Sequence, residues 1–140
     1  MSNGWLWAAG IGDGLAALGH VACIVGGPKW YRRFGAGARM EREAAAGLWR
    51  PTLITLGIAA VLSVWAAYAI TAAIGNRLPM TRWILGGIAA VYLVRGVGGI
   101  PLMQLGLGRS RSFWMWSSAI CPALAALHGI GLFTAWHVLA

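Results

Sequence analysis

Four ionisable residues lie inside long apolar stretches of this sequence: Asp13, His20, Arg95 and His128. A charged side chain among hydrocarbon is costly, and such residues usually face the interior of a helix bundle and pair with one another. A carboxylate, a guanidinium and an imidazole together can hold helices in register, pass protons or bind a small ligand. The sequence therefore predicts a buried polar cluster, whose geometry depends on the elements that carry these residues.

The apolar residues fall into four long blocks. Of the 140 residues, 59% are hydrophobic and only 10% are charged, whereas a soluble domain carries about 25% charged residues. A helix that crosses a membrane needs about 20 apolar residues, and the blocks at 5–27, 51–74, 83–105 and 113–138 are all long enough. Strands are disfavoured, because a barrel needs shorter, alternating segments. We predict an all-α polytopic membrane protein, with residues 1–140 forming one four-transmembrane-helix bundle.

The distribution of basic residues predicts the orientation of this bundle. The loop after the first span and the last loop carry eight of the ten basic residues nearest the spans: Lys29, Arg32, Arg33, Arg39, Arg42, Arg50, Arg109 and Arg111, against Arg77 and Arg82 in the middle loop. Lysine and arginine are enriched in cytoplasmic loops. Both termini are therefore expected on the outer side. No positively charged region precedes the first span, so we expect it to be retained rather than cleaved.

The helical rise then places the ionisable residues in depth. At 1.5 Å per residue, Asp13 lies about 12 Å from the outer end of its span, His128 about 15 Å, Arg95 about 18 Å and His20 about 22 Å. Tyr92 precedes Arg95 by three residues and shares its helix face. We therefore predict a cluster of Asp13, Arg95 and His128 that Tyr92 can join, with His20 nearer the cytoplasm.

The loop at 28–50 is predicted to be basic and amphipathic. Its first residues alternate aromatic and basic side chains: Lys29, Trp30, Tyr31, Arg32 and Arg33. Such a segment suits the lipid headgroup layer and attracts anionic lipid; the alternative is a plain topogenic loop with interface anchors. A short helix is expected at 38–46. Because the net charge of +8 is explained by these flanking residues, nucleic acid is not an expected partner.

The polar cluster is open to several functional interpretations. No catalytic motif of soluble enzymes occurs, no metal or cofactor is expected, and we expect a non-enzymatic protein whose cluster serves bundle structure or binds a small ligand. The alternative is a proton-coupled transporter or proton relay through Asp13, His20 and His128. Two histidines could also ligate haem, although their depths differ by about 7 Å, and a membrane-embedded enzyme acting on lipid or quinone is a further alternative.

Three segments resemble stretches of small, uncharacterised four-span proteins of bacterial inner membranes. They are 28–37 (PKWYRRFGAG), 93–96 (LVRG) and 113–118 (FWMWSS). The resemblance covers most of the chain and implies a multi-pass protein of a bacterial inner (plasma) membrane, but no activity. In such a membrane the orientation predicted from the basic residues makes both termini periplasmic. Small-residue pairs such as Gly10 and Gly14 predict close helix packing. Such faces also allow a homo-oligomer or another membrane protein as a partner.

Overall fold

The computed structural model describes residues 2–105 and 109–139, and this part of the chain forms helices and no strands. The helices are α1 (Gly4–Gly26), α2 (Pro28–Arg33), α3 (Ala38–Ala45), α4 (Arg50–Ala73), α5 (Thr81–Gln104) and α6 (Arg111–Ala135). Helices α1, α4, α5 and α6 are long and apolar enough to cross a membrane. The predicted all-α, four-span architecture is therefore confirmed. Residues 106–108, predicted to lie in the last loop, are outside the described residues.

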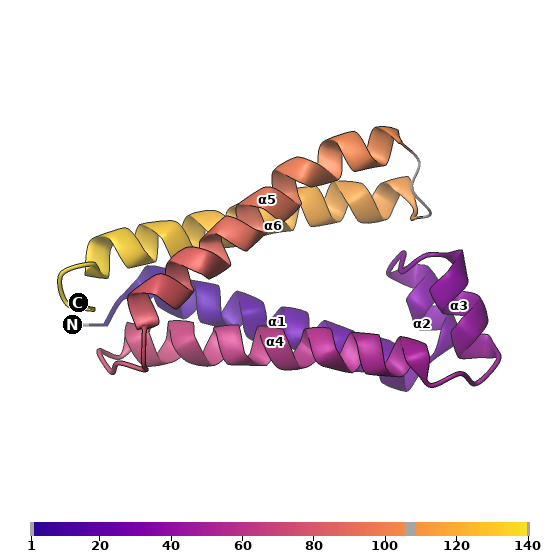
Figure 1. Cartoon of the computed structure of the whole chain (residues 1–140), viewed down its shortest axis with the longest axis horizontal. Coiled ribbons are helices and arrows are strands. Elements are labelled where there is room, and N and C mark those ends of the chain that lie inside the picture. The colour runs from indigo at the N-terminus through magenta and orange to yellow at the C-terminus, as the bar shows by residue number, and fades with distance from the viewer. Residues whose placement is uncertain (1, 106–108, 140) are drawn as a thin grey trace.

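The four long helices form two antiparallel pairs (Figure 1). Helix α1 packs along α4 and α5 packs along α6, while contacts between α1 and α6 join the two pairs. The pairs lie close together where the two chain termini meet and diverge toward the opposite end, where α2 and α3 lie. We call these two ends of the bundle the terminal end and the loop end.

Glycines allow the closest approaches between the long helices. A Cβ atom on Gly10 would lie 2.6 Å from Cγ1 of Ile70 and 3.2 Å from the carbonyl oxygen of Ala66, so α1 and α4 need a glycine here. Between α6 and α1, a Cβ on Gly131 would lie 2.7 Å from the Leu6 side chain. Nothing lies within 4 Å of a Cβ built on Gly14. The predicted small-residue face of α1 is therefore used only at its first glycine.

Asn3 ties three helices together at the terminal end. Its side-chain oxygen accepts hydrogen bonds from the backbone N–H groups of Trp5 and Leu6, which caps α1. Its amide nitrogen donates to the carbonyl oxygen of Gly131 at 2.9 Å and to the hydroxyl of Thr134 at 3.0 Å, both on α6. Its backbone N–H donates to the carbonyl of the last residue of α4. One residue therefore holds this end of the bundle closed.

Replacing Asn3 should separate the capping contribution from the interhelical one. Asn3→Ser keeps a capping oxygen but cannot reach α6, so we expect it to lower the free energy of unfolding by about 1 kcal/mol. Asn3→Ala loses both contributions and should cost about twice as much. Denaturant unfolding of the protein in detergent micelles measures the difference. Equal costs for the two variants would contradict the interhelical role.

The loop end carries two short helices where one was predicted. Helix α3 matches the predicted helix at 38–46, but α2 was not predicted, although Pro28 suits a first helical position. Tyr31, expected at the lipid headgroups, is instead buried, and its hydroxyl donates to Oγ1 of Thr55 at 3.1 Å. Gly35, with a φ of 67°, approaches the start of α6 so closely that a Cβ would lie 2.6 Å from Cβ of Phe113. The loop therefore contacts both helix pairs.

Ion pairs hold α3 against the start of α4. Glu43 accepts hydrogen bonds from Arg39 at 2.7 Å and from Arg50 at 2.6 Å. The hydrogen bonds from Arg39 and then from Arg50 hold the pKa of the Glu43 carboxyl below its ordinary value of 4.5. A carboxyl whose pKa is lowered by folding stabilises the folded state above its ordinary pKa, and this contribution disappears as the pH falls through the folded pKa.

Acidification should therefore loosen α3 before it affects the buried helices. We expect backbone amides of α3 to exchange faster with solvent as the pH falls below about 4.5, after correction for the intrinsic rate. Hydrogen–deuterium exchange with mass spectrometry measures this change. In Glu43→Gln the same amides should already exchange fast at pH 7 and lose the additional pH dependence; an unchanged profile in this variant would show that other contacts hold α3.

Candidate functional site

Three polar side chains lie on the buried faces of three different helices. Asp13 follows Leu6 and Ala9 on the buried face of α1, Tyr92 follows Ile88 on α5, and His128 follows Leu124 on α6. In each helix the buried residues recur at intervals of three and four, which is the period of one helix face. The apolar pattern that packs the bundle therefore also directs these polar groups inward.

These three residues form the central polar site. The Tyr92 hydroxyl donates a hydrogen bond of 2.6 Å to Oδ1 of Asp13. Nε2 of His128 lies 3.1 Å from Oδ2 of Asp13, and Nδ1 of His128 lies 3.0 Å from the carbonyl oxygen of Leu124. Asp13 and His128 are completely buried. The Trp65 ring meets Tyr92 edge-on, with 5.2 Å between centroids, and closes the site on the α4 side.

The hydrogen-bonding partners restrict where the protons of this site lie. A backbone carbonyl only accepts, so Nδ1 of His128 carries a proton. The contact between Nε2 of His128 and Oδ2 of Asp13 then needs one further proton, which makes either an imidazolium–carboxylate pair or a neutral imidazole beside a carboxylic acid. Both forms have zero net charge. The contact is short but is not aligned as a hydrogen bond.

Arg95 does not belong to this site, which corrects the predicted pairing of Asp13 with Arg95. Cζ of Arg95 lies 4.9 Å from the ring centroid of Trp114 and 5.6 Å from that of Phe113, both near the loop end of α6. Arginine has a long side chain that can carry its charged group several ångströms from its Cα toward the membrane surface. The depth of its Cα therefore did not predict the position of its guanidinium.

The other predicted site residues lie apart from Asp13. His20 is half-buried, and its Nδ1 lies 2.8 Å from the carbonyl oxygen of Ala16 on its own helix. Within the described residues, no hydrogen bond or ion pair connects it to Asp13. The loop residues predicted at the headgroups are exposed with the exception of Tyr31: Lys29, Trp30, Arg32 and Arg33.

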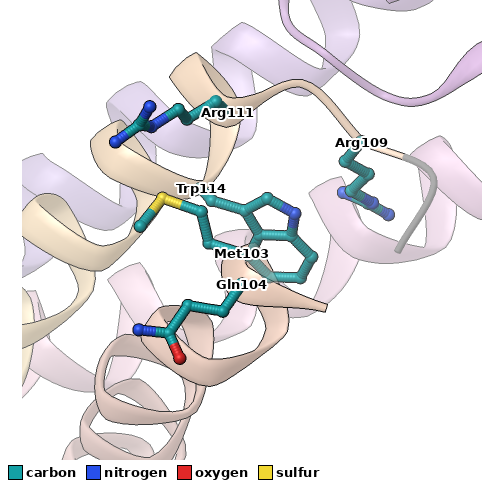
Figure 2. Close-up of a pocket in the computed structure, with 5 residues that line it drawn as sticks. All are labelled: Met103, Gln104, Arg109, Arg111 and Trp114. Atoms are coloured by element: carbon teal, nitrogen blue, oxygen red, sulfur yellow. The ribbon is translucent and has the colours of Figure 1, made fainter. Parts of the chain in front are cut away.

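Two cavities at the loop end were not predicted from the sequence. Each has a volume of about 310 Å³, and Met103 of α5 and Trp114 of α6 line both. Figure 2 shows the first cavity, where Arg109 and Arg111 lie on opposite sides of the Trp114 ring and Gln104 lies below it. The arginines and tryptophans at 109–116 were the available signal, but the arginines were used only to predict the orientation of the bundle. Neither cavity is lined by a residue of the central polar site.

The residues of the central polar site are poorly placed to bind a metal ion or haem. In the described part of the chain, no group of three or more His, Cys, Asp or Glu residues is placed to hold a metal ion. Both ring nitrogens of His128 already face protein groups, so the imidazole would have to leave Asp13 to reach an iron. Cys23 and Cys121 are free thiols.

The chain was compared with models of known protein families, with curated proteins and with solved structures, and none of them matches it. Function must therefore be argued from the site itself.

Proposed function

We propose that this chain is a non-enzymatic, multi-pass membrane protein in which the central polar site serves bundle structure. The observation that carries this proposal is the complete burial of Asp13 and His128 with their polar groups directed at one another. Groups buried in this way fix the relative register of α1, α5 and α6, because any sliding of one helix separates a charge from its partner. The described cavities lie elsewhere in the bundle, which also favours a structural role.

A proton-coupled transporter is the second candidate. It is favoured by one observation, the distance of 3.1 Å between Nε2 of His128 and Oδ2 of Asp13, two groups that can exchange a proton. A carrier must also connect this pair with water on both sides of the membrane. His20 lies nearer the loop end and would be the next group on such a path, but its ring nitrogen contacts its own helix. The structural role therefore has the stronger support.

Proton flux into proteoliposomes distinguishes the two roles. The purified protein is reconstituted with a pH-sensitive dye inside the vesicles, and an outward or inward pH difference is imposed. A structural site predicts a decay of the pH difference equal to that of protein-free vesicles. A proton carrier predicts a faster decay that Asp13→Asn abolishes while the protein remains folded. The asparagine keeps an acceptor for Tyr92 and offers an N–H group to a neutral His128.

We further propose that the loop end faces the cytoplasm of a bacterial cell, with both termini periplasmic. The basic loops at this end support it. Lys29, Trp30, Arg32 and Arg33 are exposed there and suit contact with anionic headgroups. The test is labelling of Ala38→Cys, an exposed position of α3, in a background without the two native cysteines. If a membrane-impermeant thiol reagent labels this cysteine from the periplasmic side, the proposed orientation is wrong.

A further inference from the structure

Three buried hydrogen-bond donors at the loop end have no partner in the described protein. They are Nη1 of Arg95, Nε1 of Trp114 and Oγ of Ser118. The Trp114 side chain as a whole is buried to more than nine-tenths. Guanidinium and indole nitrogens only donate, and a buried donor without an acceptor costs about 1–3 kcal/mol. One unsatisfied group is common in native proteins, but three of them in one place indicate a missing acceptor.

Two of these donors, on Arg95 and Ser118, lie beside Gly99 between α5 and α6, and the third belongs to the ring that Arg95 covers. The guanidinium of Arg95 lies over the ring of Trp114, and Ser118 is one helical turn after Trp114. A Cβ built on Gly99 would lie 3.4 Å from Nη1 of Arg95 and would also collide with Oγ of Ser118. Both atoms therefore flank the backbone of Gly99, where a larger residue would not fit. The two cavities adjoin this region, since Trp114 lines both and Ser118 lines one.

The missing acceptor must be anionic, because the local charge is positive and uncompensated. The chain contains three acidic residues, and each contacts a partner elsewhere: Asp13 with His128, Glu41 with Arg32, and Glu43 with Arg39 and Arg50. Cζ of Arg109 lies 4.5 Å from the ring centroid of Phe113, the ring that Arg95 also covers. Arg109 is exposed, but partial desolvation by its neighbours, and then the like charge of Arg95, lower its pKa. Two guanidinium groups therefore lie over one aromatic ring, and no carboxylate among the described residues pairs with either of them.

We propose that the loop end of α5 and α6 binds a phosphate group, with Arg95, Trp114 and Ser118 as hydrogen-bond donors and Arg109 as a second cation. A phosphate has several acceptor oxygens and can accept from more than one of these donors. Trp114 and Ser118 are the fourth and eighth residues of α6, so the site lies about 5–10 Å from the end of that helix. This is close to the boundary between the headgroups and the acyl chains of a membrane whose hydrocarbon core is about 30 Å thick. The apolar lining of the cavities, including Met103, Ile100 and Ala119, suits the acyl chains of the same molecule.

Ligand titrations with matched variants test this site. The purified protein in a nonionic detergent is titrated with short-chain phosphatidylglycerol, short-chain phosphatidylcholine or inorganic phosphate, and binding is followed by native mass spectrometry. We expect saturable binding of phosphatidylglycerol that is tighter than that of phosphatidylcholine. Arg95→Gln should weaken it at least about tenfold, and Trp114→Phe and Ser118→Ala several-fold, because each removes a hydrogen bond to a charged group. The last two variants are conservative and guard against loss of fold in the first.

Two further variants provide the controls. Trp116→Phe changes an exposed tryptophan that lines neither cavity, and Arg82→Gln removes a cation at the terminal end. Neither should change binding. Saturable binding of inorganic phosphate alone, with the same pattern of sensitive and insensitive variants, would support the site with free phosphate as its ligand. Binding that is absent, or that all five variants weaken equally, would overturn the proposal.

Discussion

Asp13→Leu is expected to lower the free energy of unfolding by about 3–5 kcal/mol, the typical cost of removing one partner from a buried ion pair. The substitution leaves the imidazole of His128 and the hydroxyl of Tyr92 without their acceptor in a completely buried site. His128→Leu should cost a similar amount, because it strands the carboxylate. Denaturant unfolding in detergent micelles, followed by tryptophan fluorescence, measures both values.

The double variant provides the sharper test. Replacing both partners of a buried pair with apolar residues of similar volume is often neutral, so Asp13→Leu combined with His128→Leu should cost well below the sum of the single costs. The remaining loss comes from the Tyr92 hydroxyl. Ile11→Leu, a lipid-facing change on the same helix, should leave the free energy of unfolding unchanged. Additive costs would show that Asp13 and His128 act independently, and the structural proposal would then fail.

The sequence predicts the architecture and most of the central polar site for related reasons. A membrane span has a fixed length and composition, so each apolar block predicts one helix, and the four predicted spans match α1, α4, α5 and α6. Within a helix the rise per residue is constant, so depth can be counted. Depth predicted Asp13 near the level of His128, and the spacing from Arg95 added Tyr92. Both contact the carboxylate in the structure, through side chains that are shorter and stiffer than that of arginine.

Arg95 is the residue for which depth counted along the helix gave the wrong position of the charged group. The guanidinium stands at the end of a long flexible chain, and its position depends on aromatic rings of α6 that no count along α5 reveals. Helix α2 was missed for a similar reason. Its six residues are too few to show a helical period, and its position depends on the contact of Tyr31 with Thr55. Both features arise from tertiary contacts, to which a pattern along one helix is insensitive.

The glycines of α5 illustrate the same limit and give a second prediction with a large effect. Gly96 and Gly98 are two residues apart in one apolar run and cannot be ranked from the sequence. In the structure, a Cβ on Gly96 would lie 2.5 Å from Cγ of Pro122 and 3.2 Å from its backbone nitrogen, whereas one on Gly98 would meet nothing within 4 Å. Proline has a rigid ring, so Pro122 cannot rotate out of the way and α5 must move from α6.

We therefore expect Gly96→Ala to lower the free energy of unfolding by about 1–3 kcal/mol, the usual cost of overpacking. Gly98→Ala, its matched control, should be neutral or slightly stabilising, since alanine favours a helix by up to about 1 kcal/mol over glycine. Unfolding in detergent micelles compares the two. Combining Gly96→Ala with Pro122→Ala removes the ring that blocks the new methyl group and should recover part of the loss. If the combined variant recovers nothing, the cost of Gly96→Ala does not come from a collision with the Pro122 ring.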